Sequence, residues 1–315
     1  MQPKLLDLTL ELIQRCPNSC LFCSSLATAD SEYQLSLGEI ENVLDQAVDL
    51  GLRTIGISGG EPLLHPDISL IIPELTKRLV VRLYTTGIYL DPRGRAIHFS
   101  DWGAFDRTKT AIIFNVQSTD DAVHDRLTCS KGSLGLTARA IQSAKSEGFH
   151  VEVHMVPNLI NLDTIESSVA DLCGWGVDQV SFLRLVPQGR AEMNAPALVL
   201  NRENTSRLRS IMQNLSQADW GSMKLRFGIP FSGLFHQKLA CNAGISKLII
   251  RYDGVVLPCE AFKCARFDNF KLGHIHTDSL SEMLVYGKFH RQMNFLKDEA
   301  ESYLESCPAQ IHWAA

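Results

Sequence analysis

Three cysteines near the start of the chain have the residue type and spacing best suited to chemistry. Cys16, Cys20 and Cys23 follow one another as Cys-x3-Cys-x2-Cys. Three thiolates on one loop can hold a soft metal centre, but they leave one coordination position open. A structural zinc ion normally takes four protein ligands, whereas an iron–sulfur cluster held by three cysteines keeps one iron open for another molecule. On spacing alone, a zinc loop with a distant fourth ligand remains the alternative.

A second motif, Gly59-Gly60-Glu61-Pro62, follows the next predicted strand. Two glycines allow a backbone to approach a ligand closely, and Glu61 offers an acceptor for an ammonium group. The cysteine triplet also follows a predicted strand. Because α/β folds place their active sites at the carboxyl ends of parallel strands, we expect both motifs at the same edge of the sheet.

Together the two motifs make the chain resemble the radical S-adenosylmethionine (SAM) superfamily. The resemblance implies that Cys16, Cys20 and Cys23 hold a [4Fe–4S] cluster whose open iron binds SAM. It also implies that one electron, from a donor such as flavodoxin or ferredoxin, cleaves SAM to a 5′-deoxyadenosyl radical that takes hydrogen from an unactivated carbon. The residues that the resemblance places near SAM are Phe22, Gly59, Gly60, Glu61, Pro62, Thr85 and Arg184.

A second group of cysteines lies near the end of the chain. The spacing Cys241-x12-Gly254-x4-Cys259 resembles the opening of the SPASM and twitch modules, which add an auxiliary iron–sulfur cluster to radical SAM barrels. The resemblance implies an auxiliary [4Fe–4S] cluster held by Cys241, Cys259, Cys264 and Cys307. Four cysteines are too few for a full SPASM module, so a twitch-like module with one cluster fits better. One alternative is that Cys264 is free, which leaves a second open iron. The others are a zinc knuckle or unrelated thiols.

Three further residues are candidates for work on the substrate. Cys129 follows the fourth predicted strand, and its weak S–H bond makes it a possible hydrogen-atom donor; an ordinary loop thiol is the alternative. Glu152 and His154 alternate within the fifth predicted strand, so both can face the barrel interior and position or deprotonate a substrate. A structural, hydrogen-bonded histidine is an equal alternative at His154.

The elements that must position these residues alternate between strand and helix patterns. This alternation indicates an α/β fold with parallel strands, and six units favour a partial (β/α)6 TIM-like barrel. We expect the barrel over residues 1–200, and a linker helix with a small α+β cluster domain over 201–315. The predicted strands are Leu5–Ile13, Arg53–Ser58, Val80–Thr85, Ala111–Gln117, His150–Val156 and Gln179–Leu185. The predicted helices are Leu37–Leu50, Asp67–Arg78, Ser133–Glu147, Leu162–Trp175, Asn201–Gln217 and Ser279–Phe295.

Composition narrows the functional classes. The chain has 315 residues with a formal net charge of -5 and scattered basic residues, so we expect no nucleic-acid partner. It has no apolar run long enough to span a bilayer and no secretory signal, which predicts a cytoplasmic protein without a membrane partner. The first predicted strand begins within a few residues of Met1, so we expect either that a peptide-leader-binding domain is a separate protein or that the substrate is a small molecule.

The predicted function is a radical SAM enzyme that modifies a peptide by epimerisation, cross-linking or oxidation. One alternative is an epimerase or dehydrogenase of a small metabolite such as an aminoglycoside or nucleoside. A more distant alternative is a non-catalytic iron–sulfur or zinc protein.

Overall fold

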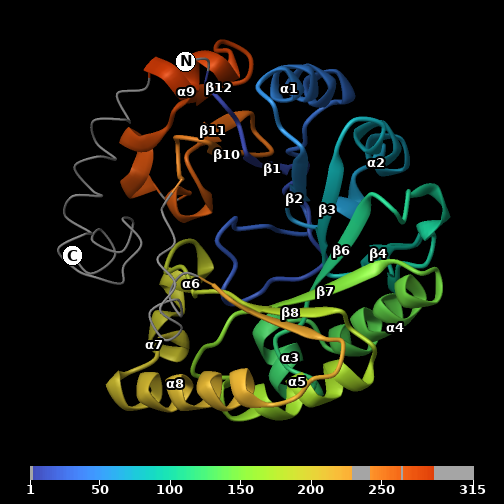
Figure 1. Ribbon diagram of the computed structural model, residues 1–315, viewed down its shortest axis with the longest axis vertical. Coiled ribbons are helices and arrows are strands. Elements are labelled where there is room, and N and C mark those ends of the chain that lie inside the picture. Colours follow the sequence, from blue (N-terminus) through green and yellow to red (C-terminus); the bar gives the residue numbers. More distant parts are fainter. Residues whose placement is uncertain (1–2, 229–241, 264, 287–315) are drawn as a thin grey trace.

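A curved sheet of mostly parallel strands organises the chain (Figure 1). The computed structural model describes residues 3–228, 242–263 and 265–286. The six predicted strands are confirmed and lie side by side in chain order. They are β1 (Asp7–Glu11), β2 (Thr54–Ser58), β3 (Val80–Thr85), β6 (Thr110–Asn115), β7 (His150–Met155) and β8 (Gln179–Phe182). These strands form the partial barrel, and the order of the described strands leaves its sheet open at both edges.

The sheet continues beyond the six expected strands on both sides. Strand β9 (Lys224–Phe227) adds parallel to β8, and β10 (Lys247–Ile250) adds parallel to β1. Two short antiparallel strands, β11 (Val255–Leu257) and β12 (Gly273–His274), then follow β10. The sequence analysis assigned no strand to these regions. The division of the chain at residue 200 stays a prediction, and one sheet runs through both parts.

Helices cover the outer side of the sheet, as the strand–helix alternation requires (Figure 1). The described helices confirm most predicted ones, and two of them have clear start signals. Ser36 and Glu39 form a capping box at α1, and the Asn201 side chain caps α8. The α-helices are α1 (Leu37–Asp49), α2 (Ile68–Thr76), α3 (Asp121–Thr128), α4 (Ser133–Ser146), α5 (Ile165–Gly174), α6 (Arg190–Met193), α7 (Ala195–Leu198), α8 (Arg202–Gln217) and α9 (Leu280–Tyr286).

Several elements of the structure were not predicted from the sequence. Helix α3 and the short α6 and α7 are new, and a hairpin of β4 (Ile88–Leu90) and β5 (Ala96–His98) fills a segment without a predicted element. Helix α9 begins where the last predicted helix begins, and the end of that prediction lies outside the described residues. The described 3-10 turns are η1 (Pro62–Leu64), η2 (Trp102–Ala104), η3 (Leu162–Thr164), η5 (Glu260–Phe262) and η6 (Ala265–Phe270).

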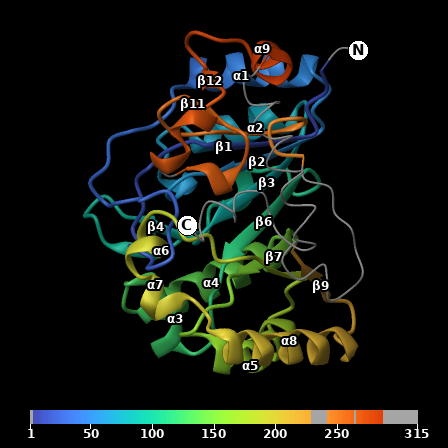
Figure 2. The ribbon, with the colours of Figure 1, turned by 90° about the vertical axis from the view of Figure 1, so that its left-hand side faces the viewer.

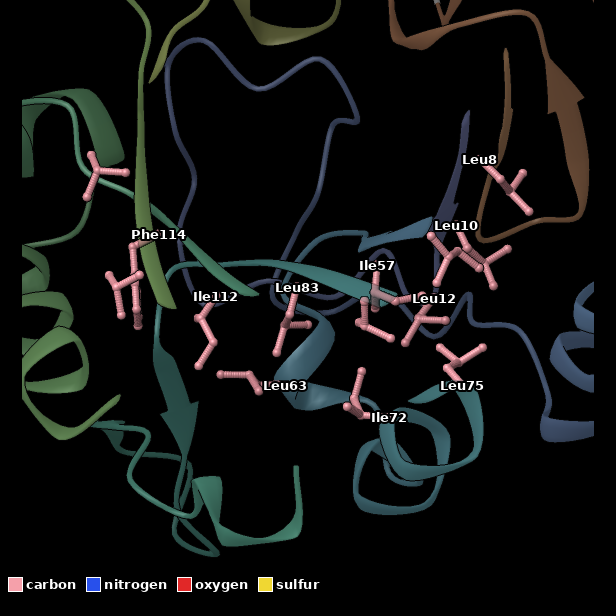
Figure 3. Packing of buried hydrophobic residues seen from close by; sticks show 14 of the residues in the cluster. Leu8, Leu10, Leu12, Ile57, Leu63, Ile72, Leu75, Leu83, Ile112 and Phe114 are labelled. Atoms are coloured by element: carbon pink, nitrogen blue, oxygen red, sulfur yellow. The ribbon is translucent and has the colours of Figure 1, made fainter. Parts of the chain in front are cut away.

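The two faces of the sheet differ in chemistry. Successive side chains of a strand point to opposite faces of the sheet. Those that point toward the helices form the apolar core, in which Leu8, Leu10, Ile57, Leu83 and Phe114 are fully buried (Figure 3). The alternate side chains face the concave interior and are largely polar. They include Thr9, Glu11, Arg82, Tyr84, Asn115, Glu152, His154, Gln179 and Ser181. A closed eight-stranded barrel fills its centre with branched apolar side chains. The interior of this open barrel is instead suited to a polar ligand.

The C-terminal part of the described chain returns to the N-terminal side of the barrel. Helix α9 lies beside α1 (Figure 2), and the Leu280 N–H donates to the Gln46 side chain at 2.8 Å. No helix within the described ranges is long and apolar enough to cross a membrane.

Candidate functional site

The cysteine loop begins directly after β1, at the carboxyl edge of the sheet. Cys16 and Cys20 are buried, Cys23 is partly buried, and none of the three forms a disulfide. The loop folds back on itself, since the Cys16 N–H donates to the Thr28 carbonyl at 3.0 Å and the Cys23 N–H donates to the Cys20 carbonyl at 3.2 Å. The three predicted ligands are therefore brought together on one ordered loop.

The environment of these thiols suits a bound metal centre. Burial, and then the neighbouring Cys23, raise the pKa of Cys20 to about 12. Burial and the neighbouring Cys20 raise the pKa of Cys16 well above its ordinary value. Buried thiolates so close together are unfavourable on their own, and a soft cation that replaces their protons removes this cost. The donor set therefore fits the cluster that the sequence predicts.

A cluster and a single ion require different arrangements of the cysteine sulfurs. Across the described ranges, no three His, Cys, Asp or Glu side chains converge as the ligands of one metal ion do. In a [4Fe–4S] cluster each cysteine binds a different iron, so its sulfurs need not converge on one point. A tetrahedral zinc site requires that convergence.

Arg190 holds the cysteine loop from the other side of the barrel opening. Its Nε donates to the Cys20 carbonyl and its Nη1 to the Ala27 carbonyl, both at 2.8 Å, and its backbone N–H donates to the Cys23 carbonyl at 3.0 Å. The preceding Gly189 has a φ of +61°, and a Cβ there would lie 2.7 Å from the Cys23 carbonyl oxygen. The resemblance to the radical SAM family placed residues 184–190 near SAM, but the sequence analysis did not predict that Arg190 holds the cysteine loop.

The Gly-Gly turn packs against the start of the same loop. The Gly60 N–H donates to the Ile13 carbonyl at 2.5 Å, and the Glu61 N–H to the Arg15 carbonyl at 2.8 Å. A Cβ on Gly60 would lie 2.2 Å from the Arg15 carbonyl oxygen, and one on Gly59 would lie 2.4 Å from that of Ile13. We expected these glycines to admit a ligand. In the structure the space next to their Cα atoms is filled by protein backbone.

Glu61 is buried and its carboxylate is fully engaged within the protein. Oε1 accepts from the Thr85 hydroxyl at 2.6 Å and the Leu63 N–H at 3.1 Å, while Oε2 accepts from the hydroxyl and N–H of Thr86, both at 2.6 Å. Burial raises the pKa of Glu61, and these four hydrogen bonds oppose the rise. A carboxylate has about four lone-pair sites, so no side-chain acceptor remains for an ammonium group. Glu61 and Thr85 therefore fix the turn to the end of β3, and contact between the turn and SAM stays a prediction.

Helix α3 supports the loop between the cysteines. The Ser19 N–H donates to the Thr128 carbonyl at 3.1 Å and the Leu21 N–H to the Leu127 carbonyl at 2.8 Å. Phe22 packs against the apolar cluster that includes Leu127. The N-cap Asp120, whose side chain accepts from the Val123 N–H, was the sequence signal that could have identified this helix.

Cys129 lies at the C-cap of α3 rather than on a loop directly after β6. It is exposed, has a left-handed φ of 52°, and lies close enough to Cys20 for its charge to contribute to the raised pKa of Cys20. Its predicted role as hydrogen-atom donor stays a prediction.

Glu152 and His154 both face the barrel interior, as their alternation indicated, but their surroundings differ. Glu152 accepts from Arg82 Nη2 at 2.8 Å and from Gln179 Nε2 at 3.0 Å. These contacts join Glu152, on β7, to side chains of β3 and β8. The structure thus suits Glu152 to ordering the strands.

His154 Nε2 is buried and has no hydrogen-bond partner within the described residues. Burial, and then Arg82 and Arg226, lower the pKa of His154 to about 3, so the ring is neutral at physiological pH. The ring of Tyr84 lies 5.4 Å away between centroids, and Asn115 is the neighbour of His154 in the adjacent strand. A buried unpaired ring nitrogen is costly, so this atom is a good candidate to bind a ligand in the interior.

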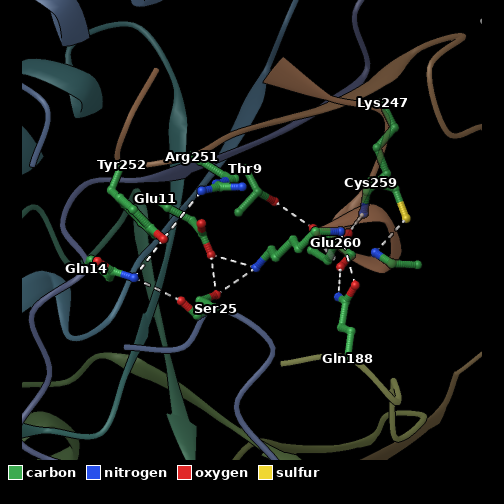
Figure 4. A network of polar contacts seen from close by, with 12 residues as sticks. Thr9, Glu11, Gln14, Ser25, Gln188, Lys247, Arg251, Tyr252, Cys259 and Glu260 are labelled. Carbon is green, nitrogen blue, oxygen red and sulfur yellow. Dashed lines mark hydrogen bonds and ion pairs between the residues drawn. The ribbon is translucent and has the colours of Figure 1, made fainter. Parts of the chain in front are cut away.

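The remaining predicted residues are only partly described. Arg184 follows the end of β8 and is partly buried. Cys259 is the N-cap of η5, and its sulfur accepts from the Ala261 N–H at 3.3 Å (Figure 4). The other three predicted ligands of the auxiliary cluster, Cys241, Cys264 and Cys307, lie outside the described residues.

Comparisons with known proteins agree with this geometry. The radical SAM superfamily model matches residues 10–172, and the SPASM model of an iron–sulfur cluster-binding domain matches residues 241–309. The chain therefore belongs to the radical SAM superfamily and carries a cluster-binding module of the SPASM type. SAM and two [4Fe–4S] clusters are the cofactors expected of these two domains.

Individual relatives cover most of the chain. The PqqA peptide cyclase of Ruegeria pomeroyi is 28% identical over 259 residues, which are 80% of this chain and 66% of that protein. The chain thus spans about two thirds of that relative's length. The fold resembles SuiB of Streptococcus suis bound to the precursor peptide SuiA, with a TM-score of 0.70 and 16% identity over 92% of this chain and 67% of SuiB. It also resembles anSMEcpe with bound AdoMet, with a TM-score of 0.69 and 14% identity over 91% of this chain and 82% of that one.

Replacing Gly60 by Ala should disturb the cysteine loop. The new Cβ has no room beside the Gln14 and Arg15 carbonyls, so we expect a loss of about 1–3 kcal/mol in the free energy of unfolding and less bound iron. Gly38 in α1 has no atom within 4 Å of its Cβ position and is the matched control. Gly38→Ala should leave iron content unchanged and stabilise the helix by up to about 1 kcal/mol. Anaerobic urea unfolding and iron analysis measure both, and equal behaviour of the two variants would contradict the packing argument.

His154 should make the fold sensitive to mild acid. Its folded pKa of about 3 lies below the value of an unfolded histidine, so protons favour the unfolded chain and stability falls as pH drops below about 6.5. Phenylalanine cannot titrate. When the pH falls from 7.5 to 5.5, we therefore expect the free energy of unfolding of His154→Phe to decrease by about 1 kcal/mol less than that of the parent chain. Urea unfolding at both pH values tests this, and an identical pH dependence would show that folding does not lower the pKa of His154.

Proposed function

We propose that this chain is a radical SAM enzyme that modifies a peptide by joining two of its side chains. The observation that carries the proposal is the similarity to PqqA peptide cyclase over 80% of the chain. The chain also resembles SuiB in fold, and SuiB was solved with a precursor peptide. This likeness supports a peptide as a substrate that such a fold can accept. The sequence analysis favoured peptide modification but left the reaction open between epimerisation, cross-linking and oxidation.

The chain supplies ligands, support and shielding for this chemistry. We propose Cys16, Cys20 and Cys23 as ligands of one cluster, and the turn at residues 59–62 as part of the SAM site. Cys241, Cys259, Cys264 and Cys307 are the proposed ligands of the other cluster. When bound, SAM and the clusters supply a hydrogen-abstracting radical and a one-electron oxidant. A flavodoxin or ferredoxin is the proposed electron donor.

The interior face of the barrel is the proposed peptide site. A peptide offers N–H and C=O groups along its whole length, and the neutral ring of His154 has an unsatisfied nitrogen that can bond to either kind of group. Asn115 lies beside it in the sheet and Tyr84 packs near its ring. We propose that these residues orient the substrate, while Arg82 and Glu152 keep the strands below them in register.

Epimerisation is the second candidate, and one observation favours it. The Cys129 thiol is exposed and lies near Cys20, at the end of the helix that supports the cysteine loop. A thiol in this region could return a hydrogen atom to a substrate radical. If Cys129→Ala leaves turnover unchanged, Cys129 has no part in the reaction.

The first test concerns the clusters and SAM cleavage. Anaerobically reconstituted chain should be brown, bind about eight irons, and release 5′-deoxyadenosine from SAM with dithionite. Cys16→Ala should bind about four irons and release no 5′-deoxyadenosine. Cys173→Ala is the matched control, because Cys173 lies in α5 and contacts the Trp220 carbonyl. It should behave like the parent chain, and a colourless zinc protein would contradict the proposal.

The second test separates the two reactions. The probe is any short precursor peptide that the neighbouring genes encode, incubated with enzyme, SAM and dithionite in D2O. Cross-linking removes two hydrogen atoms, so mass spectrometry should show the corresponding loss and no new deuterium on carbon. A product of unchanged bonding that carries one carbon-bound deuterium would instead establish epimerisation.

A further inference from the structure

We propose that Gln188, Gly189 and Arg190 bridge the two cluster-bearing loops, and that Gln188 is a positioning residue for the auxiliary cluster. The inference rests on the proposed auxiliary site, to which it adds a residue that holds it. One side of this bridge is Arg190, which fixes the cysteine loop through the Cys20, Cys23 and Ala27 carbonyls.

The other side of the bridge is Gln188, whose side chain is fully buried. Its Nε2 donates to the Glu260 carbonyl at 2.5 Å, and its Oε1 accepts from the Lys263 N–H at 3.0 Å (Figure 4). Glu260 and Lys263 are the first and last of the four residues between Cys259 and Cys264. One amide thus satisfies backbone groups near both ends of the segment between two proposed ligands.

Ion pairs and hydrogen bonds hold the same segment against β1 and β10. Lys263 Nζ lies 2.6 Å from Glu11 Oε1 and donates to the Ser25 hydroxyl at 2.9 Å, and both charged side chains are almost completely buried. The Glu260 carboxylate accepts from the Thr9 hydroxyl and pairs with Lys247, each at 3.1 Å. Glu11 ends the strand before Cys16, and Ser25 is two residues after Cys23. The contacts of this segment therefore lead back to the cysteine loop.

This arrangement explains why a fully buried glutamine is placed at residue 188. An aliphatic side chain would leave the Glu260 carbonyl and Lys263 N–H unsatisfied in a partly buried place, which is costly. Electron exchange between two clusters depends steeply on their separation, so a rigid connection between their loops would keep that separation constant. Gly189 keeps the bridge short, because a Cβ there would clash with the Cys23 and Ser24 carbonyls.

The experiment compares two equally buried glutamines in the reconstituted full chain. Gln188→Leu removes the bridge. Gln117→Leu, the matched control, removes a fully buried amide that bonds to Asn115, His154 and Val156, away from the 259–263 segment. Iron content and electron paramagnetic resonance of the reduced chain are measured with and without SAM, since only the SAM-binding cluster should change its signal on SAM addition.

We expect Gln188→Leu to fall from about eight to about four irons and to keep the SAM-sensitive signal, while Gln117→Leu keeps both signals. An unchanged auxiliary signal in Gln188→Leu, or equal iron loss in both variants, would overturn the bridge. If Gln188→Leu does not fold, Gln188→Glu is the second variant, because it keeps the shape of the side chain and one acceptor. Its auxiliary-cluster signal should shift while the SAM-sensitive signal does not. Two unchanged signals would reject the inference. A parent chain with four irons would instead refute the auxiliary cluster itself.

Discussion

The structure depends on a contact between two stretches of backbone that leaves no room for a side chain. Residues 59–61 lie against residues 13–15, joined by hydrogen bonds from the Gly60 and Glu61 N–H groups. The first stretch directly follows β2, and the second leads from β1 into the cysteines. Because Glu61 is in turn bonded to Thr85 and Thr86 at the end of β3, the start of the cysteine loop takes its position from three neighbouring strands. Small changes in the contact between residues 59–61 and 13–15 would therefore move the cysteine thiols.

The open barrel explains why the polar groups lie where they do. A sheet that does not close leaves a concave face that apolar side chains alone cannot fill, and polar residues of one parity occupy it along β1, β3, β7 and β8. Most of them are paired, as Glu152 is with Arg82 and Gln179. Among the described residues of this face, His154 Nε2 and Glu11 Oε2 are buried without a hydrogen-bond partner. We propose that His154 Nε2 binds a ligand, since buried polar atoms are rarely left without a partner.

Much of the fold could be predicted because local patterns determine it. The six β-branched strands and the amphipathic helices between them have clear periods, and right-handed crossovers leave few ways to assemble them. Helix α3 was not predicted, since its short polar segment has little apolar periodicity. The pairing of β10 with β1 joins residues more than two hundred positions apart. No local pattern can indicate such a pairing, because it depends on which sheet edge remains open.

The sequence by itself determined the chemistry of this protein: three cysteines with one open coordination position, the Gly-Gly-Glu-Pro turn, and a second set of cysteines. These identify the family because residue type and spacing along one loop control which metal centre it can hold. Only the tertiary structure decided what the supporting residues do. It turned the glycines toward protein backbone, engaged Glu61 in the support of its own turn, and brought Gln188 and Arg190 between the two loops. Such roles depend on which distant groups meet in space, and spacing along the chain does not contain that information.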